Sequence, residues 1–175
     1  RLMRAMDANN PEPSLWQVDA NLRPEGKSGA LVRTLESHIA YYSRWAENWE
    51  FQALLKARPL AGDEELGNKY FEAINPLVWQ STQRENFVES VQRMRERVSD
   101  NIPGDEAEWQ IKLGVGGLRD IEFTVQLLQL VHGRTDESVR MADTISAIEA
   151  LSNASYIGRA EATEFSLSLI HISEP

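Results

Sequence analysis

Alternating apolar and polar residues predict a short β-strand near the start of the chain. Successive side chains of a strand point to opposite faces, so the apolar and polar sets separate. One face carries Val18, Ala20 and Leu22, and the other carries Gln17, Asp19, Asn21 and Arg23. Residues 24–29, Pro-Glu-Gly-Lys-Ser-Gly, are typical of a turn. We therefore expect a strand followed by a basic, glycine-containing turn.

Apolar residues at three- and four-residue spacing predict two helices in the next part. The first begins at the turn and ends before Pro59. Its stripe is Leu35, Ile39, Tyr42, Ala46, Trp49 and Ala53, flanked and widened by Tyr41 and Trp45. The second has Asp63 as its N-cap, with acidic residues in its first turn, and ends at Asn75-Pro76. Its buried side is expected to be Leu66, Tyr70, Phe71 and Ile74.

A third helix is predicted from a capping box, in which Thr82 is followed three residues later by Glu85. Its apolar stripe is Phe87, Val91, Met94 and Val98. Its solvated face is expected to carry Arg93, Arg95, Glu96 and Arg97.

An acidic linker over residues 100–108 separates this helix from a second helical group. The helix Leu118–Gly133 is strongly apolar, so we expect it in the middle of a bundle. A last pair, around residues 143–153 and 158–165, completes the helical layer.

Composition narrows the function class. Net charge is −9, with 27 acidic against 18 basic residues, which argues against nucleic-acid binding. No apolar run reaches membrane-spanning length. The absence of cysteine excludes disulfides and thiolate chemistry, and it fits a cytoplasmic location.

The predicted strand and turn offer candidate chemistry. The carboxylate of Asp19 suits a cation, while Arg23 and the basic glycine turn suit phosphate oxygens. An edge strand with a solvated polar face and an ordinary turn is the alternative, and the residues alone favour it.

A second glycine segment precedes the apolar helix. Gly114, Gly116 and Gly117 lack the spacing of nucleotide-binding fingerprints, so a simple turn into a helix is favoured over an anion site. Arg119 is a cation at a helix start, where anions are preferred, and together with Lys112 it hints at a phosphate or carboxylate partner. His38 and His132 lack companions at metal-ligand spacing.

Both ends of the chain look cut. The segment Ser166 to Pro175 resembles translated sequencing-adapter sequence, so we expect it to be non-native and give His171 no role. The protein is then an internal fragment of a longer one.

Three ordered segments carry a resemblance to a known family. VDANLRPEGKSGALV, WEFQALLKARPLAGD and IKLGVGGLRDIEFTVQLLQLVHGR resemble the glutamine synthetase adenylyltransferase/deadenylyltransferase family. The likeness runs from about Leu2 to Phe165. The family implies two nucleotidyltransferase halves, each a palm followed by a helical bundle. One half removes AMP from glutamine synthetase by phosphorolysis, and the other adds it from ATP.

The residues of these motifs resemble those of the deadenylylating half. The third segment reads KLG-x-GG-[IL]-R-[DE]-IEF, whereas the adenylylating half tends to read LRPSG in the first segment and to lack arginine at the position of Arg119. The resemblance implies that Asp19 is a catalytic, metal-binding residue, the third carboxylate of a Mg²⁺ site. The partner Gly-Ser and Asp-x-Asp elements are absent from the sequence and are expected upstream of Arg1, so the fragment alone is expected to be inactive.

The resemblance also implies nucleotide (ATP/ADP) and phosphate contacts by basic residues. These are Arg23, Lys27, Lys56, Arg58, Lys112 and Arg119. Of these, Arg23 is the first candidate for phosphate contact. Asp120 and Glu122 either bond to the basic groups or are only acids of a helix start. Arg33 and Arg44 are expected on a solvated helix face.

The expected fold class is mainly α with a small α+β part: the C-terminal portion of a nucleotidyltransferase palm followed by an all-α helical bundle. The expected domains are a truncated palm at 1–79, a helical bundle at 80–165 and the tail at 166–175. Glutamine synthetase and PII signalling protein are the expected partners, in the cytoplasm, without nucleic acid or membrane.

Three alternatives stay open. The first is that the chain is the adenylylating half of the same enzyme. The second is a related uridylyltransferase that modifies PII protein, and the third is a non-catalytic acidic helical module that docks a protein partner.

Overall fold

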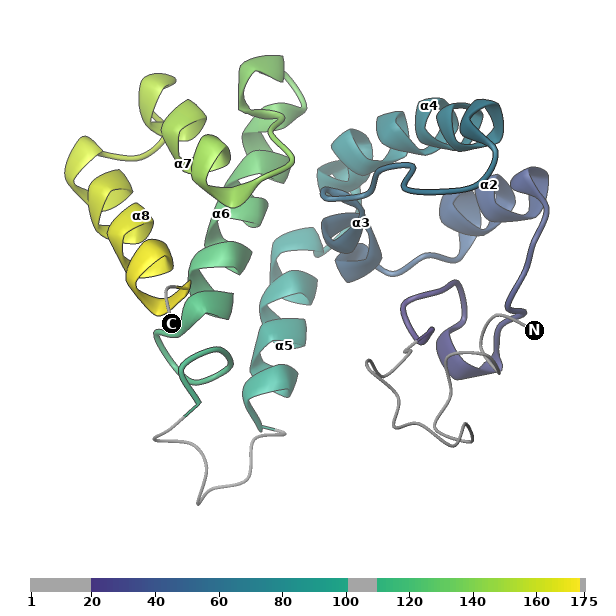
Figure 1. Ribbon diagram of the computed structural model, residues 1–175. Coiled ribbons are helices and arrows are strands. Elements are labelled where there is room, and N and C mark those ends of the chain that lie inside the picture. Colours follow the sequence, from purple (N-terminus) through teal and green to yellow (C-terminus); the bar gives the residue numbers. More distant parts are fainter. Residues whose placement is uncertain (1–19, 101–109, 174–175) are drawn as a thin grey trace, which may run out of the picture. The chain divides into compact units, whose positions relative to one another are not determined.

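The computed structural model describes residues 20–100 and 110–173 (Figure 1). Every regular element within these ranges is a helix. Contacts divide the chain into two compact units, one ending at Arg44 and the other beginning at Trp45. This division differs from the expected domain boundary after residue 79, because the helices that follow Trp45 pack against the later helices. No helix in the described ranges is both long and apolar enough to cross a membrane.

The first unit contains a turn, the 3-10 helix η1 (Gly26–Ser28) and α2 (Leu35–Arg44). The strand prediction is wrong for its described part, because residues 20–23 contain no strand: residues 21–22 form a turn and residue 23 a bend. Residues 15–19 lie outside the described residues. A strand needs a partner for its backbone groups, and the described ranges contain none. The turn is closed tightly instead: a Cβ on Gly29 would lie 1.9 Å from the Pro24 carbonyl oxygen, so only glycine fits there.

The single helix expected up to Pro59 is two helices, α2 and α3 (Asn48–Leu54). A capping box starts α3: the Glu47 side chain accepts from the third helical residue, Glu50, whose own side chain accepts from the Glu47 amide at 2.8 Å. These bonds satisfy amides that a helix start leaves unpaired. Trp45 falls in the break and is 73% exposed, so its predicted role in the apolar stripe is wrong.

The next helix, α4 (Glu64–Gln80), has the predicted N-cap, since Asp63 Oδ1 accepts from the Leu66 amide at 2.9 Å. The predicted end at Pro76 is wrong. A proline inside a helix costs about 3 kcal/mol, but each large apolar side chain that becomes buried contributes about 1.5–3 kcal/mol. Val78 and Trp79 are both buried after the proline, so burial outweighs the lost bond.

The first half of α4 differs from the predicted pattern. Leu66 is 52% exposed and Phe71 is 41% exposed, and Tyr70 is half-buried. Only Ile74 of the four expected buried residues is buried. The helix therefore packs through its C-terminal half.

The helix α5 (Phe87–Asp100) starts later than predicted. Residues Ser81–Gln83 form the 3-10 helix η2, and Asn86 adopts a left-handed conformation with φ 52°. Asparagine tolerates that conformation better than most residues, so it separates the two helices. The predicted stripe is otherwise correct at Phe87 and Val91, which are buried.

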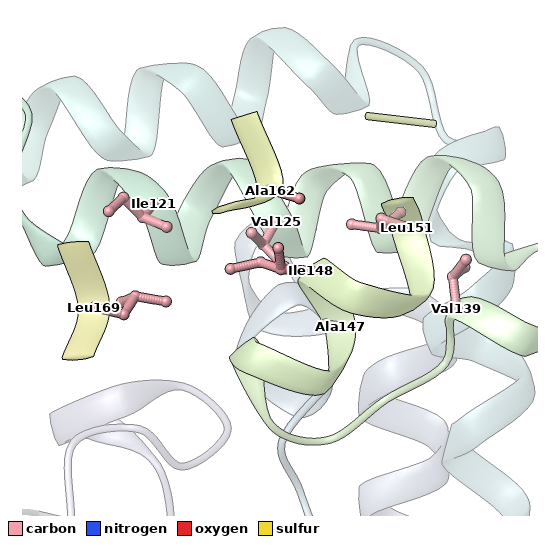
Figure 2. Close-up of a cluster of buried hydrophobic side chains, with 8 residues drawn as sticks. All are labelled: Ile121, Val125, Val139, Ala147, Ile148, Leu151, Ala162 and Leu169. Carbon is pink, nitrogen blue, oxygen red and sulfur yellow. The ribbon is translucent and has the colours of Figure 1, made fainter. Parts of the chain in front are cut away.

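Helix α6 (Leu118–Gly133) has the predicted bounds and the predicted central position. It contacts α3, α4, α5, α7 (Thr144–Asn153) and α8 (Arg159–Ser173). Figure 2 shows the core it forms with α7, α8 and the 3-10 helix η4 (Glu137–Val139). The core consists of Ile121, Val125, Val139, Ala147, Ile148, Leu151, Ala162 and Leu169.

The last helix is longer than expected. A helix was predicted over 158–165, and α8 continues to Ser173. Leu169 is 8% exposed and belongs to the core, so part of the segment expected to be non-native packs like ordinary sequence. The origin of residues 166–175 stays a prediction.

Candidate functional site

The turn of the first unit is organised around one guanidinium group. Arg23 donates from Nη1 to the Ala20 carbonyl at 2.6 Å, from Nε to the Gly29 carbonyl at 3.0 Å and from Nη2 to the Lys27 carbonyl at 3.1 Å. An arginine has five N–H donors. These three bonds leave one donor on each terminal nitrogen, so Arg23 holds the loop and keeps capacity for an anion. The side chain of Lys27 is exposed on the same turn.

The predicted metal ligand, Asp19, lies outside the described residues. In residues 20–100 and 110–173, no three histidine or acidic side chains gather closely enough to hold a metal ion. The described part therefore does not by itself make a Mg²⁺ site.

Arg33 is not on a solvated helix face, and that prediction is wrong. Its guanidinium pairs with the Glu25 carboxylate, and its Cζ lies 5.6 Å from the centroid of the Tyr41 ring. The Arg33 side chain is only 16% exposed, because it packs over the start of α2. Arg44 is exposed, as predicted.

The second unit brings together three of the residues singled out from the sequence. Lys56 Nζ donates to Glu122 Oε1 at 2.9 Å and to Thr144 Oγ1 at 3.0 Å. Arg119 Nε lies 3.8 Å from Glu122 Oε2. Of the two interpretations of Glu122, the contact with basic groups is therefore confirmed. Arg58 and Lys112 are exposed and are not held in this cluster.

The glycine segment before α6 forms a turn that starts the helix, as favoured. The Leu118 amide donates to the Ile111 carbonyl at 3.1 Å, and the Arg119 amide donates to the Lys112 carbonyl at 3.0 Å. A Cβ on Gly117 would lie 2.4 Å from the Ile111 carbonyl oxygen, which explains the glycine. Since the first amides of α6 already have carbonyl partners, they are not free to bind an anion.

Sequence reasoning missed a charge pair beside this turn. Arg95 was expected on a solvated face, but its guanidinium pairs with Asp120, and its Nη2 donates to the Gly114 carbonyl at 3.3 Å. The hydrogen bond from Arg95 lowers the pKa of Asp120, aided by the Gly116 amide, which donates at 2.7 Å. One signal was available: Arg95 follows the buried Val91 by four residues, which places both on the same side of α5.

The pair lies beside a groove between α5 and α6. The groove has a volume of about 460 Å³, and its lining includes Arg95, Asp120, Phe123 and Leu127. The groove combines apolar walls with a charge pair whose members already bind each other.

Two family models match the chain. Residues 1–73 match glutamate-ammonia ligase adenylyltransferase, and residues 84–172 match GlnD PII-uridylyltransferase.

Close relatives carry the name bifunctional glutamine synthetase adenylyltransferase/adenylyl-removing enzyme. The protein from Leifsonia xyli is 70% identical over 155 residues, which is 89% of this chain and 15% of that protein. The Streptomyces coelicolor protein is 60% identical over 163 residues, 93% of this chain and 16% of that protein. The Mycolicibacterium smegmatis protein is 59% identical over 155 residues, 89% of this chain and 16% of that protein. The chain thus spans only a small part of the length of these relatives.

Proposed function

Because this chain belongs to the family of bifunctional glutamine synthetase adenylyltransferase/adenylyl-removing enzymes, we propose that it is part of an enzyme that regulates glutamine synthetase by reversible adenylylation. The observation that carries the proposal is the 70% identity to a relative of that name over 89% of the chain. The substrates and partners of the whole enzyme are part of the same proposal.

We assign the chain to the half that removes AMP. In this reaction an oxygen of inorganic phosphate attacks the phosphorus of the AMP group on a glutamine synthetase tyrosine. The new P–O bond makes ADP, the bond to the tyrosine oxygen breaks, and that oxygen takes up a proton. The support is motif wording: the first segment reads LRPEG rather than LRPSG, and the third has an arginine at Arg119.

Two guanidinium groups are the best placed for phosphate contact. Arg23 keeps two N–H donors after closing its turn. The Arg119 side chain is 34% exposed, and its Nε lies 3.8 Å from Glu122 Oε2 without a hydrogen-bond partner among the described residues. An arginine with unused donors suits the oxygens of a phosphate group. Lys27, Arg58 and Lys112 are exposed, so they are accessible to a nucleotide.

The proposal includes Asp19 as a carboxylate of a Mg²⁺ site. A bound cation would neutralise phosphate charge as it develops. The Gly-Ser and Asp-x-Asp elements that would supply the other carboxylates are absent from the 175 residues. For that reason we propose that this chain is inactive by itself.

Glutamine synthetase is the proposed protein substrate, PII protein the proposed regulator and the cytoplasm the proposed location. The related uridylyltransferase is less well supported. Its family model covers residues 84–172, which fits a shared bundle type, whereas the adenylyltransferase model covers the segment with Asp19 and Arg23.

A test separates the two halves of the enzyme. A full-length relative would carry Arg119→Gln at the aligned position and be assayed in both directions. Loss of one charged donor to a reacting phosphate costs roughly 100-fold in rate. Phosphate-dependent ADP release from adenylylated glutamine synthetase should fall by about that factor, while AMP transfer from ATP stays unchanged.

Glu65→Gln is the matched control, since this carboxylate is exposed on α4 and, within residues 20–100 and 110–173, pairs only with Lys69. Loss of AMP transfer from ATP with intact ADP release would assign the chain to the adenylylating half. If the relative catalysed neither reaction, the enzymatic proposal would fail.

A further inference from the structure

Two polar contacts, one helical turn apart, join α3 to α6. Gln52 Nε2 of α3 donates to Gln126 Oε1 at 2.9 Å, and Lys56 Nζ, two residues after the last residue of α3, donates to Glu122 Oε1 at 2.9 Å. Residues four apart lie on the same side of a helix. Gln52 pairs with Gln126, whereas the later residue Lys56 pairs with the earlier residue Glu122. The two segments therefore run in opposite directions where they meet.

The same ammonium group reaches a third helix. Lys56 Nζ donates to Thr144 Oγ1 at 3.0 Å, and Thr144 is the first residue of α7. Two of the three donors of the ammonium are therefore committed to protein oxygens. The N-cap of α7, Asp143, also feels this charge: its pKa is lowered mainly by the Ser146 amide, with Lys56 adding to the effect.

These contacts cross the boundary between the two family matches. Gln52 and Lys56 lie in the segment that matches the adenylyltransferase model, residues 1–73. Their partners on α6 and α7 lie in residues 84–172, which match the uridylyltransferase model. Along the chain, Lys56 is 66 positions from Glu122 and 88 positions from Thr144.

We propose that Lys56 is a positioning residue that fixes the end of α3 to the helical bundle through Glu122 and Thr144. The contact sets where the end of α3, which lies in the segment that matches the adenylyltransferase model, packs on the bundle. Its consequence for catalysis rests on the proposed function, but the contact itself does not.

Lys56 and Arg119 approach the same carboxylate, that of Glu122, at different distances. Lys56 binds Glu122 at 2.9 Å, whereas Arg119 Nε stays at 3.8 Å and has no hydrogen-bond partner in the described part of the chain. Lys56 therefore holds Oε1 of Glu122, and Arg119 stays beyond hydrogen-bond distance of Oε2. A phosphate could recruit Lys56 only by competing with Glu122 and Thr144.

A double-mutant cycle on the 175-residue chain tests the contact. The variants are Lys56→Met, Glu122→Gln and the two combined, each unfolded in urea. The two side chains are 42% and 30% exposed, and an ion pair of this kind changes the ratio of folded to unfolded protein by about two- to fivefold. Each single variant should lose about that factor, and the double variant should lose no more than the larger single loss.

Controls separate the contact from general effects of losing a lysine. Lys69→Met removes an exposed ion pair with Glu65 on α4 and should be close to neutral. Thr144→Val should weaken the chain by itself, and Lys56→Arg should restore most of the stability. At about 1 M salt the loss in Lys56→Met should shrink, because charge pairs are screened. Additive losses in the cycle, or a Lys56→Met variant no different from Lys69→Met, would overturn the proposal.

A kinetic measurement tests positioning in a full-length relative. With Lys56→Met at the aligned position, kcat for phosphate-dependent ADP release should fall while KM for phosphate stays the same, and Glu122→Gln should reproduce the effect. A raised KM for phosphate in Lys56→Met alone would instead make Lys56 a phosphate contact. If the relative showed no such reaction, the proposed function would fail, and the unfolding cycle would still decide whether the contact exists.

Discussion

Neighbouring acidic residues at the start of α6 serve separate contacts. Glu122 faces Lys56 and Arg119, while Asp120 binds the Arg95 guanidinium and the Gly116 amide. Both acids were expected near basic groups or as helix-start acids, and local spacing could not choose between these roles. Gly116 and Arg119 are local partners, but Arg95 lies 25 residues from Asp120 and Lys56 lies 66 residues from Glu122, so only the packing of helices determines those two contacts.

The pair between Asp120 and Arg95 should make stability depend on pH. The pKa of Asp120 is lowered from its usual 3.8 by the hydrogen bond from Arg95. A carboxyl with a lowered pKa in the folded state stabilises the protein above its unfolded pKa and loses that effect as pH falls through the folded value. Urea unfolding between pH 7 and pH 3 should show Asp120→Asn less stable near neutrality, with the gap closing below about pH 4. A gap that stays constant over this range would contradict the assignment.

A close approach between two helices should make Gly133 intolerant of a methyl group. A Cβ on Gly133 would lie 2.6 Å from Trp79 Cζ3. The Trp79 ring is also held by Arg140, whose Cζ lies 4.9 Å from its centroid, and by Asn75, which accepts from Nε1 at 2.8 Å. Because the ring cannot move freely, Gly133→Ala should destabilise the chain by about 1–3 kcal/mol in chemical unfolding. Combining it with Trp79→Phe should give less than the sum of the two losses, and a neutral Gly133→Ala would argue against this packing.

Among whole elements, those with local signals were predictable. Asp63 caps α4 as predicted, α6 has the predicted bounds, and α7 lies within the range predicted for it. The wrong boundaries depend on the surroundings. The helix α4 continues past Pro76 because the residues after it are buried against other helices, which the local sequence does not reveal. The break before α3 had a visible signal in Glu47 and Glu50, although glutamate is not among the usual capping residues.

At the scale of the molecule, α3 and α4 belong with the bundle. Both contact α6, and α3 also contacts α5. Phe51 of α3 is almost fully buried, and the Arg84 guanidinium lies 5.1 Å from its ring centroid. The family motifs gave no indication of this arrangement, because they are ordered along the chain and not in space.

This arrangement predicts different outcomes for two truncations. A chain from Trp45 should unfold cooperatively within about 2 °C of the full chain, since it keeps the whole second unit. A chain from Gln80 should unfold roughly 10 °C lower or more, because several buried side chains lose partners worth about 1.5–3 kcal/mol each. Thermal unfolding followed by circular dichroism measures both. Equal midpoints for the two truncations would show that α3 and α4 add nothing to the bundle.

The candidate site was predictable only as a set of residue types. Arg23 has two N–H donors left for an anion, because the other three close its own turn. Lys56 was expected to meet phosphate and instead binds protein oxygens on α6 and α7. A motif shows which residues a family uses, whereas hydrogen-bond partners far apart in the chain require the fold.

The most direct test of the enzymatic account is the rate of ADP release from adenylylated glutamine synthetase by a full-length relative with Asp19→Asn at the aligned position. With phosphate and Mg²⁺ present, the account predicts a rate lower by about 100-fold or more, since even an outer partner of a metal site changes activity by 10- to 100-fold. Glu65→Gln should leave the rate unchanged. A rate for the Asp19→Asn variant within about twofold of the unmodified relative would contradict the account.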